Sequence, residues 1–271
     1  MLKTIIVLGA NGMLGRYIAS YFESTTKFNV VRITRNTINA LTINYENLYT
    51  ILSEYQNAII INCIGKIPQR DDNDVEKYIR INSIFPHILS ICCHVTNNTL
   101  IHITTDCVFT GKEGNYSELD IHDEKNIYGL SKSMGEPDDC CSIRTSIIGE
   151  ELENKKSLLE WVKSNKDQNI NGFTTHFWNG ITCLQLAKII YQMIDENIFW
   201  NGPRHIYTPS VVSKYDIVNM ISTIYNLNIH INPVETDKID KSLISIYQNK
   251  FIIPKLEEQI LDLKNFSQYL I

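Results

Sequence analysis

Short runs of β-branched and other apolar residues recur along the first half of the chain, separated by longer stretches with helical spacing. The runs lie at Thr4–Leu8, Val30–Thr34, Ala58–Cys63, Leu100–Thr104 and Ser142–Ile147. Strands that are apolar on both faces and alternate with helices are typical of a parallel sheet covered on both sides. The pattern therefore predicts an α/β fold built on a Rossmann-like, doubly wound parallel sheet.

The second half has a less regular pattern. Helical spacing recurs at Ser157–Lys163, Cys183–Ile194, Lys214–Tyr225 and Leu256–Leu263, with prolines breaking the chain between some of them. No repeat, low-complexity stretch or obvious linker divides the chain. We expect residues 1–150 to form the sheet domain, segments near 171–200 to return to it, and residues 151–271 to form mainly a smaller lobe.

Composition narrows the class of protein. The 271 residues are 44% hydrophobic, which is enough for a substantial core. The net charge is −5, and no basic stretch is interleaved with aromatic residues, so we expect no nucleic-acid binding. The apolar start, Met1–Gly9, is too short to span a membrane and leads into a glycine turn. We interpret it as a first strand, with no membrane partner.

Cysteine usage points to a reducing compartment. The seven cysteines are odd in number and lack the spacing of metal ligands such as Cys-x-x-Cys. We therefore expect reduced thiols, a cytoplasmic protein and no metal site.

A glycine turn, Gly9-Ala-Asn11-Gly12-Met13-Leu14-Gly15, stands between the first strand and a helical stretch. Glycines here allow a tight turn, close approach of the backbone to a pyrophosphate and close packing of helix on strand. The alternative is an ordinary tight turn that binds no ligand. The strand–turn–helix context favours dinucleotide binding by Gly9, Asn11, Gly12, Met13, Leu14 and Gly15.

The end of the second strand bears on which dinucleotide is bound. An adenosine ribose with free hydroxyls usually meets a carboxylate at this place, but the segment Val30–Asn36 has none and carries Arg32 and Arg35 instead. Because arginine pairs well with a 2′-phosphate, we expect NADP(H) to be favoured over NAD(H). Solvated surface arginines are the alternative interpretation.

A tyrosine and a lysine stand four residues apart, at Tyr128 and Lys132, downstream of Thr104-Thr105-Asp106. Residues four apart meet on one helix face, so the Lys132 ammonium can stand close to the Tyr128 phenol and favour its ionisation. Such a pair is suited to moving a proton at a carbonyl. The spacing alone also fits an ordinary helix surface, and its weight comes from the neighbouring motifs.

Six segments, taken in order, resemble one protein family. They are Gly9–Gly15, Asn62–Gly65, Arg80–Pro86, Thr104–Gly111, Tyr128–Glu136 and Ile143–Ser146. Together they resemble the extended short-chain dehydrogenase/reductases, and within them the dTDP-4-dehydrorhamnose reductases and related nucleotide-sugar 4-reductases. Asp240–Leu243 is similar to a late motif of those reductases.

The resemblance implies NADPH-dependent reduction of the C4 keto group of a nucleotide-linked 4-keto-6-deoxyhexose, as in dTDP- or UDP-rhamnose-type synthesis. Tyr128 would protonate the developing alkoxide, Lys132 would lower the tyrosine pKa and hold the nicotinamide ribose, and Thr105 would bind the substrate oxygen. Residues 1–150 would then bind NADP and the later lobe the sugar.

Further site residues follow from the same resemblance. It implies Cys63 and Gly65 beside the cofactor, and Thr105, Asp106 and Cys107 beside the substrate. Members of the superfamily often pair through the helices that here include Asn82–Cys93 and Tyr128–Glu136, so a homodimer is compatible with the resemblance.

Cys107 departs from the dTDP-4-dehydrorhamnose reductases, which commonly have tyrosine at this place. The similar epimerase/reductases carry a cysteine there for proton transfer, so a bifunctional 3,5-epimerase/4-reductase is the first alternative. That reaction needs a second acid, for which Lys155, Lys156, Lys166 and His176 stay open.

Two further alternatives concern other classes. A nucleotide-sugar 4,6-dehydratase has an acidic residue directly after the catalytic threonine, as Asp106 is here. A non-catalytic NAD(P)-binding protein would keep the glycine turn but would not need Thr105, Tyr128 and Lys132 together.

Overall fold

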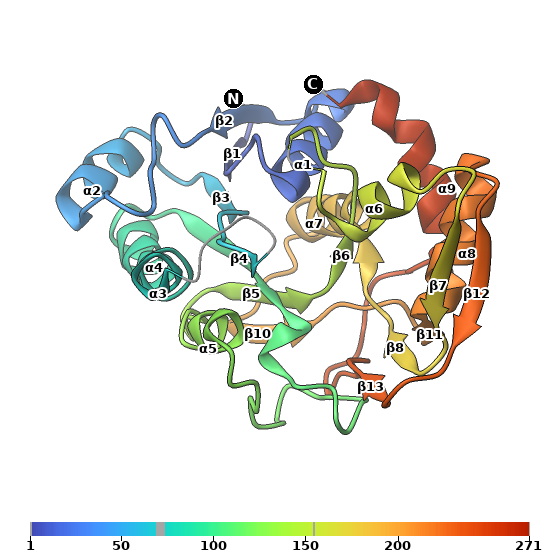
Figure 1. Cartoon of the computed structure of the whole chain (residues 1–271). Helices are drawn as coiled ribbons and strands as arrows, with labels where there is room; N and C mark the ends of the chain where they lie inside the picture. Colours follow the sequence, from blue (N-terminus) through green and yellow to red (C-terminus); the bar gives the residue numbers. More distant parts are fainter. Residues whose placement is uncertain (1, 69–73, 154, 271) are drawn as a thin grey trace.

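A six-stranded parallel sheet forms the centre of the computed structural model, which describes residues 2–68, 74–153 and 155–270 (Figure 1). The strand order is β10-β5-β4-β3-β1-β2, and every neighbouring pair is parallel. The strands are β1 (Thr4–Leu8), β2 (Asn29–Ile33), β3 (Ile59–Asn62), β4 (Thr99–Thr105), β5 (Cys141–Thr145) and β10 (Gly202–His205). The doubly wound sheet and all five strands expected in the first half are confirmed, with small shifts at their ends.

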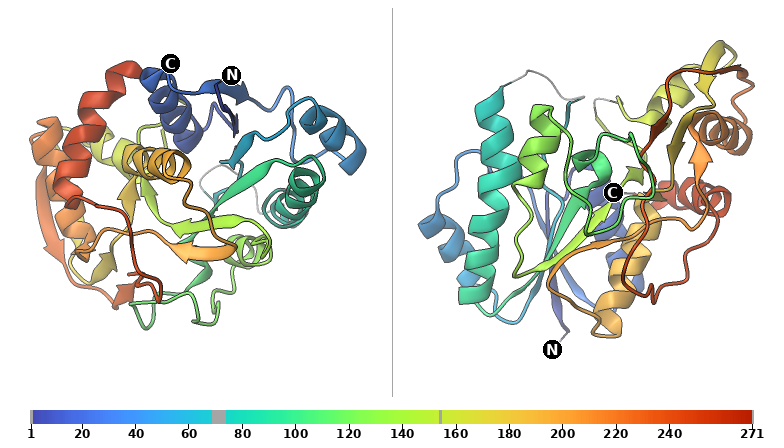
Figure 2. Two further views of the ribbon diagram at one scale, coloured as in Figure 1. Left: turned by 180° about the vertical axis from the view of Figure 1, so that it is seen from behind. Right: turned by 90° about the horizontal axis from the view of Figure 1, so that it is seen from below.

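Helices cover both faces of this sheet (Figure 2). On one face lie α1 (Met13–Thr25) and α7 (Cys183–Asp195), and on the other α2 (Tyr45–Ser53), α3 (Val75–Tyr78), α4 (Phe85–Val95) and α5 (Ile127–Ser133), with a π-helical turn over Ile79–Ile84. The strands bury both faces: Ile5 and Val7 belong to the core under α1, and Ile6 and Leu8 to the core under α2 and α4. This two-sided burial is why the strands lack polar alternation.

The second lobe combines helices with short sheets. Its helices are α6 (Leu158–Ser164), α8 (Lys214–Tyr225) and α9 (Leu256–Phe266), close to the stretches expected from the sequence. Strand β7 (Asn169–Phe173) pairs with β12 (His230–Val234), and β8 (His176–Trp178) lies between β11 (Val212–Ser213) and β13 (Ile239–Asp240). A further pair joins β6 (Ile147–Ile148) to β9 (Ile181–Thr182).

Parts of the chain beyond residue 150 rejoin the main sheet. Of the stretch near 171–200, α7 packs on α1, whereas β7 and β8 belong to the small sheets of the lobe. Strand β10, just beyond that stretch, forms the edge of the main sheet. The Phe266 ring of α9 lies 6.3 Å from Tyr17 of α1, so the lobe packs directly on the sheet domain.

The strand order reverses between β1 and β3, because the chain leaves β1 for β2 on one side and then crosses to β3 on the other. Open α/β sheets bind ligands outside the carboxyl ends of their strands at such a point. No helix in the part of the chain that the structure describes is both long and apolar enough to cross a bilayer.

Candidate active site

The glycine turn begins where β1 ends, at the point of strand reversal. Gly9 has φ +74°, a left-handed conformation that favours glycine, and its amide donates to the Ile33 carbonyl at 3.0 Å. A Cβ on Gly15 would lie 2.3 Å from the Gly9 oxygen, so only glycine allows α1 to pack this closely on the turn. The backbone therefore forms the close turn that dinucleotide binding requires.

The first turn of α1 is open to an anionic ligand. Its N-cap residue, Gly12, has no side chain to accept a hydrogen bond from the amides that follow, and the first turn holds no acidic residue. Unsatisfied amides and the positive helix end favour a phosphate. Met13, Leu14 and Gly15 contribute this turn, and Asn11 lies exposed beside it.

Cys63 and Gly65 follow β3, across the reversal point from the turn. The Cys63 amide donates to the Leu8 carbonyl at 3.1 Å, and a Cβ on Gly9 would lie 3.3 Å from the Cys63 oxygen. Asn82, which is 1% exposed, accepts from the Lys66 amide at 2.8 Å and donates to the Ser131 hydroxyl at 3.0 Å. Asn82 therefore ties the segment after β3 to α5.

The two arginines near the end of β2 differ in their surroundings. Arg32 donates to both carboxylate oxygens of Glu23, at 2.8 and 2.7 Å, and to Ser20 at 3.0 Å. Arg35 is exposed and has no hydrogen bond or ion pair with any residue of 2–68, 74–153 and 155–270. It lines a surface cavity of ≈440 Å³ together with Asn36, Asn39 and Asn47. Only Arg35 of this pair is thus available to a ligand.

Thr105 ends β4 and starts a short 3-10 turn, Asp106–Val108. Its hydroxyl accepts from the Cys107 amide and donates to the Asp106 carboxylate, both at 3.2 Å. The Cys107 thiol lies 3.5 Å from the same carboxylate. Burial raises the pKa of Asp106, and burial together with that carboxylate raises the pKa of Cys107 to about 12. The turn thus gathers a hydroxyl, a carboxyl and a protonated thiol.

The Tyr128 phenol reaches this turn from α5. Burial raises its pKa, Cys107 and Asp106 raise it further, and a side-chain hydrogen bond with Thr105 lowers it. In the protein alone the cost of burying a phenolate sets the direction of this shift, and the lowering of the Tyr128 pKa by Lys132 stays a prediction. Tyr128 is protonated and stands beside Thr105.

Lys132 is 6% exposed, and its ammonium donates to the Ile103 carbonyl of β4 at 3.1 Å. Burial lowers its pKa to about 8, while Glu136 and Cys107 act in the opposite direction. Lys132 therefore stays largely cationic at neutral pH. It also fastens α5 to the strand that ends in Thr105.

A buried polar network, which no motif of the sequence indicated, lies behind these residues. Glu136 accepts from the Thr104 hydroxyl at 2.7 Å and from Arg144, whose exposed fraction is 1%. Arg144 also contacts the ring nitrogens of His122 and His205, each at 2.8 Å. Charge-assisted bonds of this kind hold α5, β4, β5 and β10 in register.

Two lysines of the second lobe act on the Asp106–Cys107 turn and were also missed. The Asp240 amide donates to the Gly111 carbonyl at 2.7 Å, which docks the segment carrying Lys241 on the loop after β4. The Lys241 ammonium opposes the burial that raises the pKa values of Asp106 and Cys107. Burial and then Lys241 lower the pKa of Lys214, while Cys107 and Asp106 act in the opposite direction. Lys241 lies within the motif-like segment Asp240–Leu243, but only the docked lobe reveals that it and Lys214 act on the Cys107 turn.

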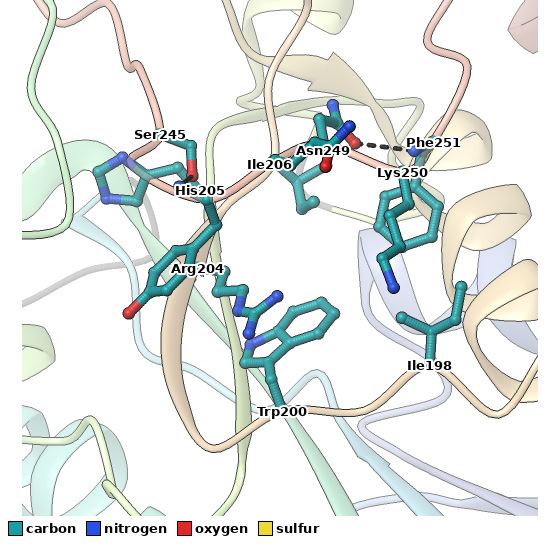
Figure 3. A pocket seen from close by; sticks show the side chains of 11 residues that line it. Ile198, Trp200, Arg204, His205, Ile206, Ser245, Asn249, Lys250 and Phe251 are labelled. Atoms are coloured by element: carbon teal, nitrogen blue, oxygen red, sulfur yellow. Dashed lines mark hydrogen bonds between the residues drawn. The ribbon is translucent and has the colours of Figure 1, made fainter.

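A separate pocket lies at the outer edge of β10 (Figure 3). The Arg204 guanidinium there stands over the rings of Trp200 and Tyr247, 4.9 and 4.3 Å from their centroids. Its lining includes none of Thr105, Tyr128 and Lys132. This pocket is therefore distinct from the candidate active site.

A family model described as the RmlD substrate binding domain matches residues 3–244. The chain belongs to this RmlD family. The resemblance to dTDP-4-dehydrorhamnose reductases and the extended short-chain dehydrogenase/reductases is thereby confirmed.

Proteins with similar sequences include subunits of methionine adenosyltransferase and dTDP-4-dehydrorhamnose reductases. Methionine adenosyltransferase 2 subunit beta from Pongo abelii is 26% identical over 257 residues, covering 86% of this chain and 75% of that protein. The dTDP-4-dehydrorhamnose reductase of Mycolicibacterium smegmatis is 26% identical over 140 residues, covering 50% and 41%.

Solved structures of the reductases share the fold. The dTDP-4-dehydrorhamnose reductase of Bacillus anthracis, solved in complex with NADP, superimposes with a TM-score of 0.82 over 98% of this chain and 100% of that one, at 19% identity. This chain therefore shares its Rossmann-like architecture with the dTDP-4-dehydrorhamnose reductases.

Proposed function

We propose that this protein is an NADPH-dependent reductase of the C4 keto group of a nucleotide-linked 4-keto-6-deoxyhexose. The observation that carries the proposal is that Tyr128 stands beside Thr105 at the end of β4, with Lys132 one helical turn further along α5 and bonded to the same strand. A hydroxyl, a protonated phenol and a cation are what a carbonyl needs when it becomes an alcohol. Membership of the RmlD family supports the same reaction class.

The cofactor proposal rests on the groups that surround the crevice. A dinucleotide would fit three neighbouring features, namely the glycine turn at Gly9–Gly15, the uncapped start of α1 and the segment Cys63–Gly65. Lys132 would hold the nicotinamide ribose, and Arg35 would meet a 2′-phosphate. When bound, the dihydronicotinamide supplies a hydride to carbon.

The proton in this proposal comes from Tyr128. Because burial keeps the phenol protonated, it can act as the acid that neutralises an alkoxide at C4. Thr105 would donate a hydrogen bond to the same oxygen, and the Lys132 cation would stabilise the tyrosinate left behind. Asp106 and Cys107 would contact the sugar beside it.

The deciding experiment is NADPH consumption with a panel of dTDP-, UDP- and GDP-linked 4-keto-6-deoxyhexoses. We expect oxidation of NADPH that depends on one of these sugars, and slower oxidation of NADH. No net oxidation with any member would overturn the reductase proposal, and a preference for NADH would overturn the cofactor assignment alone.

A 3,5-epimerase/4-reductase is the second candidate, because Lys241 and Lys214 bring cationic charge to the Cys107 thiol. A thiol with a pKa of about 12 is a weak base in the protein alone, which favours the simple reductase. Deuterium from solvent entering C3 or C5 during turnover would establish the epimerase, and its absence would exclude it.

Two other candidates predict no net use of NADPH. A 4,6-dehydratase using Asp106 would convert a 4-hydroxy nucleotide sugar while keeping its NAD. A non-catalytic NAD(P)-binding subunit is the other candidate, and the likeness to methionine adenosyltransferase 2 subunit beta suggests a partner enzyme for it. Such a subunit would bind NADP⁺ and a methionine adenosyltransferase, and would leave every 4-keto sugar unchanged.

A further inference from the structure

Arg16, in the first turn of α1, is a buried cation that has no side-chain partner among the residues that the structure describes. Its exposed fraction is 6%, and its Nε atom is buried with no hydrogen-bond partner. The guanidinium forms no side-chain hydrogen bond or ion pair within the described ranges 2–68, 74–153 and 155–270. Buried cations in proteins are normally paired, and an unpaired one is costly.

Among the described residues, the two other arginine or lysine side chains that are buried have partners. Arg144 is bound by Glu136, His122 and His205, and Lys132 by the Ile103 carbonyl. The nearest acid along the Arg16 face of α1 is Glu23, which Arg32 already occupies with two hydrogen bonds. Arg16 therefore differs from these two cations, and an anionic ligand that paired with it would offset the free-energy cost of burying its charge.

The direction of Arg16 follows from its helix face. Residues 16, 20 and 23 are spaced to share one face, and Ser20 and Glu23 both bond Arg32 of β2. Since α1 runs back against the parallel strands, its first turn lies at their carboxyl ends. Arg16, one turn before Ser20, therefore faces the end of β2, where a dinucleotide's adenosine ribose lies in this fold.

We infer that Arg16 binds the 2′-phosphate of NADP(H) and determines the preference for it over NAD(H), an inference that rests on the proposed dinucleotide site. A guanidinium offers several donors to phosphate oxygens, and the low dielectric around a buried one strengthens the pairing. Exposed Arg35 would approach the same phosphate from the solvent side.

The test is the binding of NADP⁺, NAD⁺ and 2′,5′-ADP, measured by calorimetry and by the ligand-induced rise in Tm. Arg16→Met keeps an unbranched side chain and removes the charge. We expect it to weaken NADP⁺ and 2′,5′-ADP at least tenfold and to leave NAD⁺ within about twofold. Arg16→Lys should keep part of the affinity for the 2′-phosphate. Arg32→Lys is the matched control, because it keeps a cation on Glu23, and it should not change the NADP⁺/NAD⁺ ratio.

Stability separates a binding role from a structural one. Because Arg16 has no partner, Arg16→Met should leave the Tm of the ligand-free protein unchanged or raise it, while the rise caused by NADP⁺ shrinks. Equal losses for NADP⁺ and NAD⁺, a fall in the ligand-free Tm, or unchanged NADP⁺ affinity would each overturn the inference. Failure of the wild-type chain to bind either dinucleotide would instead overturn the proposed function.

Discussion

Tyr128 is the residue on which the proposed reaction depends most. Replacing it by phenylalanine removes the proton donor and one oxygen while keeping the ring. We expect Tyr128→Phe to lower kcat by about 100-fold to 10,000-fold, because general acid catalysis contributes on that order, with NADP⁺ affinity nearly unchanged. Stopped-flow NADPH oxidation and NADP⁺ calorimetry on the same preparation measure both quantities.

A neighbouring tyrosine provides the control for that substitution. Tyr78 is buried, and its ring meets that of Tyr128 edge-on with centroids 6.4 Å apart. Tyr78→Phe removes a hydroxyl from the same aromatic pair and should leave kcat within a few-fold. Turnover in Tyr128→Phe equal to that of this control would show that the phenol is not the acid.

At the scale of elements, the junction of β1 and α1 depends on the absence of a side chain. A methyl group on Gly15 would meet the Gly9 oxygen at 2.3 Å and force the helix away from the turn. We expect Gly15→Ala to lower the free energy of unfolding by about 1–3 kcal/mol and to weaken both NADP⁺ and NAD⁺. Urea unfolding and dinucleotide titration measure these effects.

Gly65 offers a matched comparison in the same crevice. A Cβ there would lie 3.7 Å from the Asn82 side-chain oxygen, which is ordinary contact. Gly65→Ala should therefore cost little stability. If both alanine variants unfold at the same urea concentration as wild type, the close packing of α1 on the turn is not what requires glycine.

For the whole molecule, the histidines around Arg144 predict how stability depends on pH. Burial and then the Arg144 charge lower the pKa values of His122 and His205 below 6.5. Below pH 6.5 these histidines bind protons in the unfolded chain but not in the folded chain. Their contribution to the free energy of unfolding is therefore fully present above that pH and is lost as the pH decreases. We expect a loss of up to about 1 kcal/mol per histidine between pH 6.5 and 5.5, measured by urea unfolding.

The double variant His122→Gln/His205→Gln removes these two groups and should lose less stability over the same interval. His102, which is buried and has a pKa lowered by burial, remains and continues to contribute. Exposed His230 is the control, since His230→Gln should keep the wild-type slope. A double variant with the wild-type slope would contradict this explanation.

The outer surface of α4 and α5 exposes apolar side chains that could form a contact between two copies of the chain. Ile91, Val95, Leu130 and Met134 are each between 44% and 61% exposed there. His87 of α4 bonds the Met134 carbonyl, so the two helices present one surface. We expect a homodimer through it, with twice the 31.2 kDa chain mass in light scattering. Leu130→Glu/Met134→Glu should give the monomer mass, whereas a wild-type monomer at every concentration would refute the interface.

The local sequence pattern by itself determined five strands of the main sheet and the position of the glycine turn. The β-branched runs fixed the five strands of the first half, because burial on both faces requires continuous apolar sequence. Glycine spacing located the turn at Gly9–Gly15, since only glycine fits there. The spacing of Tyr128 and Lys132 and their resemblance to a family pointed to the reaction class before any contact was known.

Only the tertiary structure decided the charges of the site. The sequence did not distinguish Arg32 from Arg35, but the structure pairs Arg32 with Glu23. It also buries Arg16 without a side-chain partner in the described part of the chain. The Lys241 charge acts on the Cys107 turn from a distant segment, and burial raises the pKa of the Tyr128 phenol. Pairing and desolvation depend on residues remote along the chain, so no local pattern contains them.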